Sequence, residues 1–127
     1  KPDVLVTQLG IDSYFNDPLT HLMLTSWGYA ETVMELARLD LPWLALGGGG
    51  YDLSAVARCW AIAYGIMLGK EWPNDIPLRY REKYGMKFLR DSDGPAMGDE
   101  IRTKTRQFAE RSVQLIKTLV FPIHGLQ

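Results

Sequence analysis

Two side chains suited to chemistry each follow a short apolar stretch of this sequence. Asp12 follows residues 3–9, and Tyr51 ends a run of four glycines that follows residues 43–46. A carboxylate can bind a metal, act as a base, or cap a loop by accepting bonds from backbone N–H groups. A phenol can donate a hydrogen bond to a developing oxyanion. Two structural roles remain as alternatives to these chemical ones. Asp12 could cap the loop, and Tyr51 could pack over it.

The elements that must position both residues are predicted to alternate. Apolar and β-branched residues predict strands, helical spacing ahead of Pro42 predicts one helix, and a long apolar stretch predicts another. In order they are a strand over 3–9, a helix from 25 or 26, a strand over 43–46 and a largely buried helix over 54–68. A single crossover helix makes the two strands parallel, so their following loops leave from one sheet edge, where such sheets hold sites.

The glycine run from Gly47 to Gly50 also has to be tested as a phosphate-binding loop. A P-loop needs Lys and Ser or Thr after its last glycine, whereas Tyr51 and Asp52 follow here. The dinucleotide pattern begun at Gly47 needs a glycine where Asp52 stands. The spacing therefore excludes both nucleotide motifs and leaves a tight turn or a close approach to the backbone.

The second half of the chain offers little chemistry. Prolines and glycines over 69–99 predict a loop-rich segment, and apolar periodicity predicts a closing helix over 100–119. Its basic cluster raises the possibility of nucleic-acid binding, but Glu100 and Glu110 interrupt it and favour a solvated helix face. The cluster consists of Arg102, Lys104, Arg106 and Arg111.

Composition narrows the class of protein. The 127 residues are 46% hydrophobic and 23% charged, with a net charge of -1, which is typical of a globular domain without a basic field for nucleic acid. No apolar run approaches the roughly 20 residues that span a bilayer, so we expect no membrane partner. A single cysteine, Cys59, fits a reducing, cytoplasmic setting. The sequence enters an apolar strand directly after Asp3, which indicates a piece of a longer protein.

Four segments together resemble the last third of histone deacetylases in order and spacing. They are QLGIDS at 8–13, NDPL at 16–19, LGGGGY at 46–51 and VARCW at 56–60. The resemblance covers about the first 70 residues, and the stretch from Trp72 to Pro77 with the closing helix resembles the bacterial acetoin-utilisation branch. It implies an α/β fold, the carboxyl-terminal portion of an arginase/deacetylase-type parallel sheet sandwiched by helices, with two core strands and three main helices here.

The resemblance also implies residue roles and a cofactor. Asp12 matches a zinc-binding aspartate, and Tyr51 matches the tyrosine that polarises the acetyl carbonyl and stabilises the tetrahedral intermediate. Gly49 and Gly50 match the loop that lets this tyrosine move and forms part of the acyl channel, and Leu19 matches an apolar position lining that channel. The implied cofactor is zinc, and the implied substrate is an acetylated amine, either acetyl-lysine-like or an acetylpolyamine.

The sequence departs from a working enzyme of this family. The family needs an Asp-x-His motif and a pair of adjacent histidines, and neither His21 nor His124 belongs to such a motif. Because a catalytic zinc uses three protein ligands, we expect this chain alone to be inactive and to bind zinc weakly or not at all. Pro18 stands where several complex-bound members carry an arginine, which argues against inositol phosphate as a regulator. A non-catalytic interaction module remains the alternative.

Several structural expectations accompany this interpretation. We expect one partial domain over 1–127, with the site loops in 1–68, a loop-rich 69–99 and a closing helix within 100–120. Its partners would be the upstream part of the same protein, or a second copy through homo-oligomerisation or domain swapping, because two strands leave sheet edges exposed. Arg58 is expected to be structural rather than ligand-binding, Asp17 to shape a turn, Cys59 to be a buried small side chain, and Leu22 and Leu24 to be core.

Overall fold

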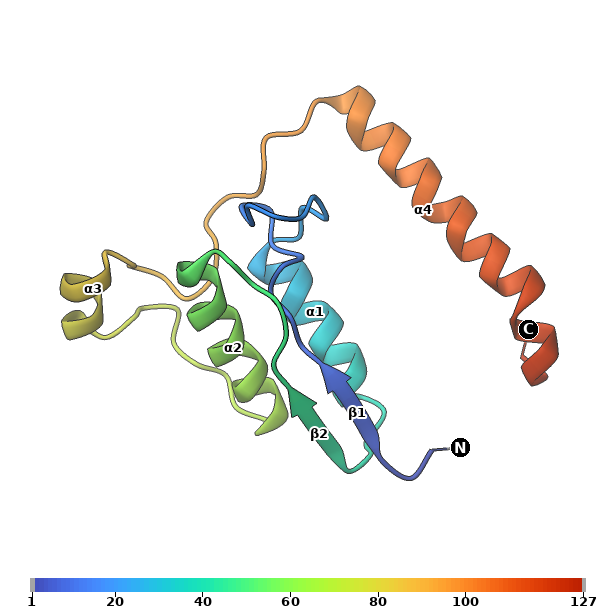
Figure 1. Ribbon diagram of the computed structural model, residues 1–127, viewed down its shortest axis with the longest axis horizontal. Helices are drawn as coiled ribbons and strands as arrows, with labels where there is room; N and C mark the ends of the chain where they lie inside the picture. The colour runs from blue at the N-terminus through green and yellow to red at the C-terminus, as the bar shows by residue number, and fades with distance from the viewer. Residues whose placement is uncertain (1, 127) are drawn as a thin grey trace. The chain divides into compact units, whose positions relative to one another are not determined.

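The computed structural model describes residues 2–126 (Figure 1). The chain forms two compact units that divide between Pro95 and Ala96. The first unit holds the strands and three helices, and the second holds the closing helix.

The first unit opens with the predicted alternation of strand, helix, strand and helix (Figure 1). The elements are β1 (Leu5–Gln8), α1 (Ser26–Ala37), β2 (Trp43–Leu46) and α2 (Leu53–Met67). β1 and β2 pair in parallel, in a register that sets Leu5 beside Trp43 and Gln8 beside Leu46. The α/β class and the parallel pairing are thus confirmed.

Capping residues set where the two long helices begin. The Thr25 hydroxyl accepts a hydrogen bond from the Gly28 N–H (3.2 Å) at the start of α1. At the start of α2, the Asp52 carboxylate accepts from the N–H groups of Ser54 (3.0 Å) and Ala55 (3.1 Å). Satisfying these otherwise unpaired donors stabilises each helix end by about 1 kcal/mol. Asp52 thereby fixes where the chain leaves the glycine run.

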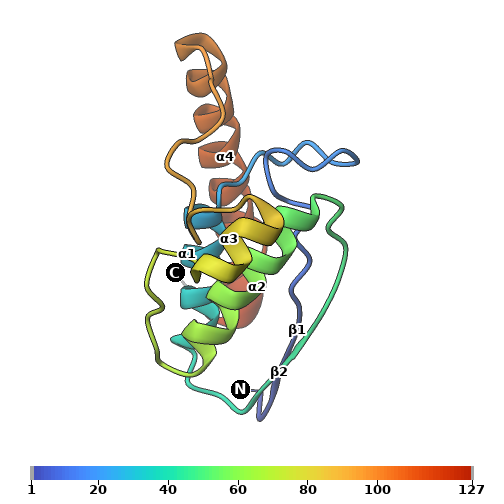
Figure 2. The ribbon, with the colours of Figure 1, turned by 90° about the vertical axis from the view of Figure 1, so that its left-hand side faces the viewer.

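Both helices lie on the same face of the sheet, and no described element of the first unit covers the other face (Figure 2). Along each strand the side chains alternate between half-buried and exposed, with Val6, Leu44 and Leu46 on the exposed face. The predicted burial of the strands therefore holds on one face only. The core between sheet and helices comprises Ile11, Tyr14, Tyr29, Val33, Ala55, Cys59 and Ala63.

Two burial predictions are wrong in this chain. The predicted burial of α2 on most of its sides fails because α2 packs against α1 alone among the described elements, which leaves Trp60 and Tyr64 exposed. Leu22, predicted as core, is 71% exposed in the loop before α1, whereas Leu24 is half-buried. In both cases no described residue of the first unit covers the apolar side chain.

The rest of the first unit contains a helix that the sequence pattern did not predict. α3 (Leu78–Tyr84) begins after Pro77 and ends at Gly85, whose φ of 71° is left-handed. Arg81 holds it in place, donating to the Ile76 carbonyl (2.5 Å) and to the Asp75 carboxylate (2.7 Å). The segment is anchored to α2 where the Trp72 indole donates to the Ala61 carbonyl (2.8 Å).

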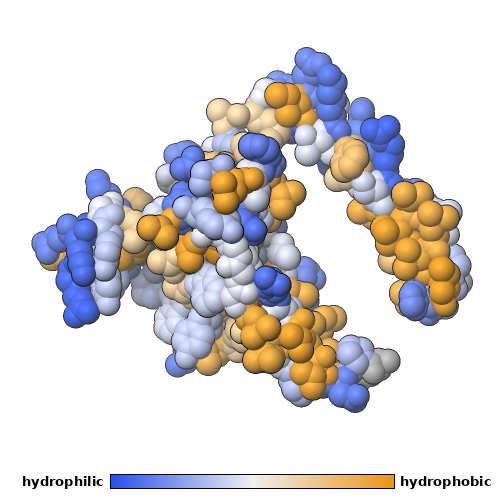
Figure 3. Space-filling model, in the orientation of Figure 1, coloured by the Kyte–Doolittle hydropathy of each residue, from blue (hydrophilic) through white to orange (hydrophobic). Residues whose placement is uncertain are grey.

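The second unit is an amphipathic helix followed by one short turn of 3-10 helix. They are α4 (Asp99–Leu119), close to the predicted bounds, and η1 (Phe121–His124). None of its described residues is buried, and Phe108 and Leu115 are among its exposed apolar side chains. Figure 3 shows hydrophobic surface along this helix. No helix formed by residues 2–126 combines the length and the apolar character needed to cross a membrane.

Candidate functional site

The loops that follow β1 and β2 run side by side. Beyond the ends of the strands, the Leu9 N–H donates to the Leu46 carbonyl (2.8 Å) and the Ile11 N–H donates to the Gly49 carbonyl (2.7 Å). These two bonds extend the parallel ladder into the loops. They bring the loop between β1 and α1 (residues 9–25, the Asp12 loop) and the glycine run to one edge of the sheet, as the strand–helix–strand order predicts.

Asp12 lies directly against the glycine run. A Cβ atom on Gly49 would overlap the Asp12 carboxylate, so only glycine allows this approach. The Thr20 hydroxyl donates to the backbone carbonyl of Asp12, and within residues 2–126 no donor reaches the carboxylate itself. The open alternative of a loop-capping Asp12 therefore has no hydrogen bond to support it, and the carboxylate is available to a ligand.

Gly50 turns the chain so that Tyr51 emerges at this edge. Its φ of 140° is one that side chains rarely adopt, and a Cβ there would lie 2.7 Å from Val56 Cγ2. Tyr51 itself is 54% exposed. Its side chain is thus presented to solvent rather than packed over the loop, which favours the chemical role of the phenol over the structural one.

Asp17 connects the two loops through its side chain. It is only 6% exposed. One carboxylate oxygen accepts from the N–H groups of Leu19 (2.9 Å) and Thr20 (3.3 Å), which closes the predicted turn. The other oxygen accepts from the N–H of Tyr51 (2.9 Å). Leu19, at the tip of this turn, is exposed.

Arg58, on α2, anchors the Asp12 loop through Tyr14. Its guanidinium pairs with the Asp91 carboxylate (2.8 Å) and donates to the Tyr14 hydroxyl (3.0 Å). Tyr14 in turn donates to Asp91 (2.8 Å), and the Ser26 N–H donates to the same carboxylate (2.7 Å). The predicted structural role of Arg58 is confirmed, with Asp91 as its partner.

Charge complementarity keeps this network ionised. Burial disfavours charged Arg58, but its bonds to Asp91 and Tyr14 outweigh burial and raise the pKa of Arg58 above its usual value. Burial likewise works against charged Asp91, yet bonds from Ser26, Arg58 and Tyr14 lower its pKa. For Tyr14, burial and then the bond to Asp91 raise the pKa to about 12. The loop is therefore held by fixed charges across the neutral range.

The donor set does not by itself fit a catalytic zinc. Such a site uses three protein ligands and one open position. Within residues 2–126 no group of three His, Cys, Asp or Glu side chains could hold a metal ion. Asp12 can supply one oxygen ligand, and two more would have to come from outside these residues.

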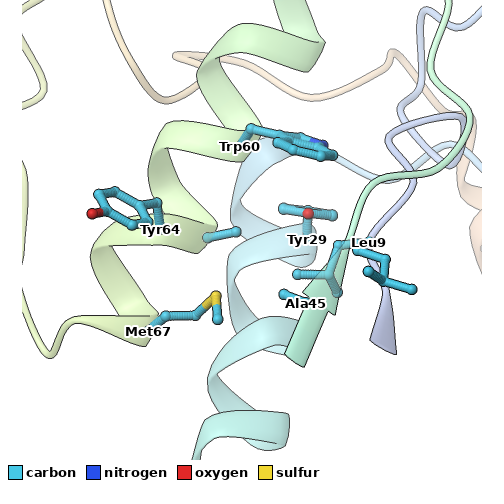
Figure 4. Close-up of a pocket in the computed structure, with 8 residues that line it drawn as sticks. Leu9, Tyr29, Ala45, Trp60, Tyr64 and Met67 are labelled. Carbon is cyan, nitrogen blue, oxygen red and sulfur yellow. The ribbon is translucent and has the colours of Figure 1, made fainter. Parts of the chain in front are cut away.

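An apolar cavity of about 270 Å³ lies beside α2 (Figure 4). The Tyr29 hydroxyl is buried there and has no hydrogen-bond partner within the described part of the chain, and burial raises the pKa of this phenol. The cavity is lined by Leu9, Tyr29, Ala45, Leu46, Trp60, Ala63, Tyr64 and Met67. This lining holds no carboxylate or imidazole and so offers no acid–base pair.

Sequence reasoning missed two of the links at this site. The Asp17–Pro18 pair signals a turn, but nothing in it indicates that the second oxygen of Asp17 reaches the backbone of Tyr51. Asp91 lies in the segment 69–99, which the sequence predicts to be loop-rich, and no sequence pattern there indicates that its carboxylate holds the Asp12 loop. The only available signal was Arg58 itself, a charged residue in an apolar helix that requires a partner.

Comparisons with known proteins point to one family. Residues 1–67 match the family model of the histone deacetylase domain. The chain is 43% identical over 84 residues to histone deacetylase 9 of Arabidopsis thaliana, covering 66% of this chain and 20% of that protein. It is 40% identical over 89 residues to histone deacetylase 1 of Homo sapiens, covering 69% and 18% respectively. The chain thus spans about a fifth of the length of the curated relatives it matches.

Proposed function

Because this chain belongs to the histone deacetylase family, we propose that it forms part of a zinc-dependent deacetylase that hydrolyses the amide of an acetylated amine. The observation that carries the proposal is the meeting of two loops at one sheet edge, with Asp12 against Gly49 and an exposed Tyr51 after Gly50. Acetyl-lysine-like and acetylpolyamine substrates both suit this chemistry.

Each residue at the edge has a role in the proposal. Asp12 supplies one of the three ligands of the zinc, and residues outside these 127 supply the other two. Tyr51 donates its phenolic hydrogen to the acetyl oxygen as negative charge develops there, without adding a charge of its own. Gly49 and Gly50 border the acyl channel, and the exposed Leu19 contributes an apolar wall.

The open sheet supports a site that is completed by more protein. β1 and β2 form a two-stranded sheet whose exposed face carries Val6, Leu44 and Leu46. Exposed apolar patches and free strand edges are costly in water and are normally covered. We infer that the rest of the deacetylase domain covers them and brings the missing histidines, so the chain alone would be inactive.

Two finer points belong to the same proposal. The relatives named above are eukaryotic proteins, whereas residues 72–77 and α4 resemble the bacterial acetoin-utilisation branch. Since these segments lie beyond the residues that match the family model, membership of the bacterial branch stays a prediction. A cytoplasmic setting likewise stays a prediction, supported by a single cysteine that is buried and unpaired.

The test compares the complete deacetylase domain with this chain alone. We expect the complete domain to bind one zinc and to deacetylate an acetyl-lysine peptide or an acetylated polyamine. Tyr51→Phe should lower turnover by about 100-fold or more with zinc retained, because one oxyanion donor is lost. Asp12→Ala should lower zinc content as well. Tyr64→Phe, which alters another exposed tyrosine, serves as the matched control.

Other outcomes would favour a different function. If the complete domain binds no zinc and turns over no acetylated amine, the second candidate gains ground: a deacetylase-like interaction module that keeps the fold without the chemistry. The exposed apolar side chains Val6, Leu44 and Leu46 suit this candidate equally well, because a binding partner would also cover them. Full activity of the isolated chain would instead contradict the assignment of Asp12 as one of three shared ligands.

A further inference from the structure

We propose that Asp17 is a positioning residue, whose carboxylate fixes the backbone of Tyr51 and thereby places the phenol at the site. This inference rests on the proposed function, since it concerns the residue that places the oxyanion donor. It differs from that function in naming a residue that need not touch substrate or metal. The two oxygens of the Asp17 carboxylate accept hydrogen bonds from different loops.

The first oxygen of Asp17 serves its own turn. It accepts from the N–H groups of Leu19 (2.9 Å) and Thr20 (3.3 Å), as an aspartate in a turn commonly does. The second oxygen reaches 34 positions along the chain and accepts from the N–H of Tyr51 (2.9 Å). A turn needs only the first oxygen, so the second is free to make this link between the loops.

Tyr51 needs such a restraint because of what surrounds it. It follows four glycines, whose backbone is free to adopt many conformations. Its own side chain is exposed, so packing does little to hold it. On the carboxyl-terminal side of Tyr51, the chain is fixed by Asp52, which caps α2. The bond from the Tyr51 N–H to Asp17 therefore restrains the amino-terminal side of Tyr51, which the helix does not restrain.

The Asp17 turn is itself well anchored. The Asp17 N–H donates to the carbonyl of Tyr14 (3.0 Å), and the Tyr14 hydroxyl belongs to the buried network of Arg58 and Asp91. The restraint on Tyr51 therefore leads back to the packed core rather than to a mobile loop. Catalytic groups need placement to within about 0.5 Å, and a displacement of about 1 Å can cost 100-fold in rate.

Asp17→Asn tests the link with little change in shape. The amide oxygen can still close the turn, but the amide nitrogen is a donor and would then face the Tyr51 N–H, which is also a donor. In the complete deacetylase domain we expect turnover to fall at least tenfold, with KM and zinc content close to those of the unaltered enzyme. Asp93→Asn, at an exposed aspartate, is the control and should leave turnover unchanged.

A double-mutant cycle separates positioning from general destabilisation. If Asp17 acts through the phenol, Asp17→Asn should lower turnover less than twofold in a Tyr51→Phe background, because the positioned group is already gone. An equal loss in both backgrounds would overturn the proposal. If Asp17→Asn does not fold, Asp17→Ser takes its place in the cycle, since its hydroxyl can close the turn but is too short to reach Tyr51.

Amide hydrogen exchange provides a readout that does not depend on activity. In the complete domain, Asp17→Asn should speed exchange of the Tyr51 N–H at least tenfold while leaving the Ser54 N–H, capped by Asp52, unchanged. Unchanged exchange at Tyr51 would overturn the link whatever the kinetics show. Faster exchange at Tyr51, combined with no kinetic effect of Tyr51→Phe, would instead place the fault in the proposed function and reject a catalytic purpose for the link.

Discussion

Arg58 and Asp91 form an ion pair 2.8 Å long whose side chains are only 10% and 8% exposed. Arg58 comes from α2, and Asp91 comes from the segment after α3, outside the residues that match the family model. Asp91 also accepts from Tyr14 in the Asp12 loop and from Ser26 at the start of α1. One carboxylate thus holds three parts of the first unit together.

Asp91→Asn should destabilise the first unit by about 3 kcal/mol. Removing one charge of a buried pair leaves the other charge uncompensated in the interior, which costs more than the pair itself contributes. Urea unfolding measures the change in the free energy of unfolding. Asp75→Asn breaks the more exposed pair with Arg81 and should cost less than about 1 kcal/mol. Equal losses from the two variants would contradict a buried, uncompensated Arg58.

Tyr14 should make the fold sensitive to alkaline pH. Burial and the bond to Asp91 raise the pKa of Tyr14 to about 12, above the value of about 10 for an unfolded chain. The unfolded state therefore loses the proton first. Stability from this group is fully present below about pH 10 and is lost between about pH 10 and 12, by about 2–3 kcal/mol.

Unfolding measured from pH 8 to 12 checks this sign. In Tyr14→Phe this part of the alkaline decline should be absent, while a Tyr80→Phe control at an exposed position should follow the unaltered chain. A decline of the same size in Tyr14→Phe would assign it to other groups.

Cys59 should be unreactive in the folded chain. It is fully buried, and burial raises the pKa of its thiol to about 12, so almost no thiolate is present at pH 8. A disulfide reagent added at pH 8 should react about a thousandfold more slowly than in denaturant. The rate should follow the unfolding transition as urea is added. Rapid labelling in the absence of urea would show that α2 opens locally.

The chain by itself should self-associate. The exposed sheet face carries Val6, Leu44 and Leu46, and the free strand edges offer unpaired backbone groups. Sedimentation at tens of micromolar should show species larger than a monomer, and Leu44→Lys should shift them towards monomer. Leu53→Lys, at an exposed position outside the sheet, should leave the distribution unchanged. A monomer at all concentrations would contradict association through this face.

The main elements could be predicted because local signals bracket them. Pro42 and Gly47 flank β2, which has the predicted bounds. Asp52 caps α2, and the helix begins at Leu53, one residue before the predicted start. α3 escaped prediction because it spans seven residues, none of them buried, and so carries no apolar period. It is held instead by Arg81, whose bonds to Asp75 and Ile76 depend on the folded backbone.

The site could be predicted in outline for a topological reason. Parallel strands bring their following loops to one edge, which predicts that the Asp12 loop and the glycine run lie together, and the bond from the Ile11 N–H to the Gly49 carbonyl confirms it. The link from Asp17 to Tyr51 could not be predicted, because a backbone N–H is the same at every residue but proline. An arginine in an apolar helix predicts an acidic partner for Arg58, but the sequence has fifteen aspartates and glutamates and does not indicate which of them pairs with it.

The Asp91 network also bears on the order in which the first unit folds. Asp91 joins residues that lie 33, 65 and 77 positions away along the chain. Closing such long loops costs chain entropy before any contact offsets it. We therefore expect the strand–helix–strand–helix segment to collapse first and the Asp91 segment to lock onto it after the rate-limiting step, so that loss of Asp91 speeds unfolding and leaves the folding rate nearly unchanged.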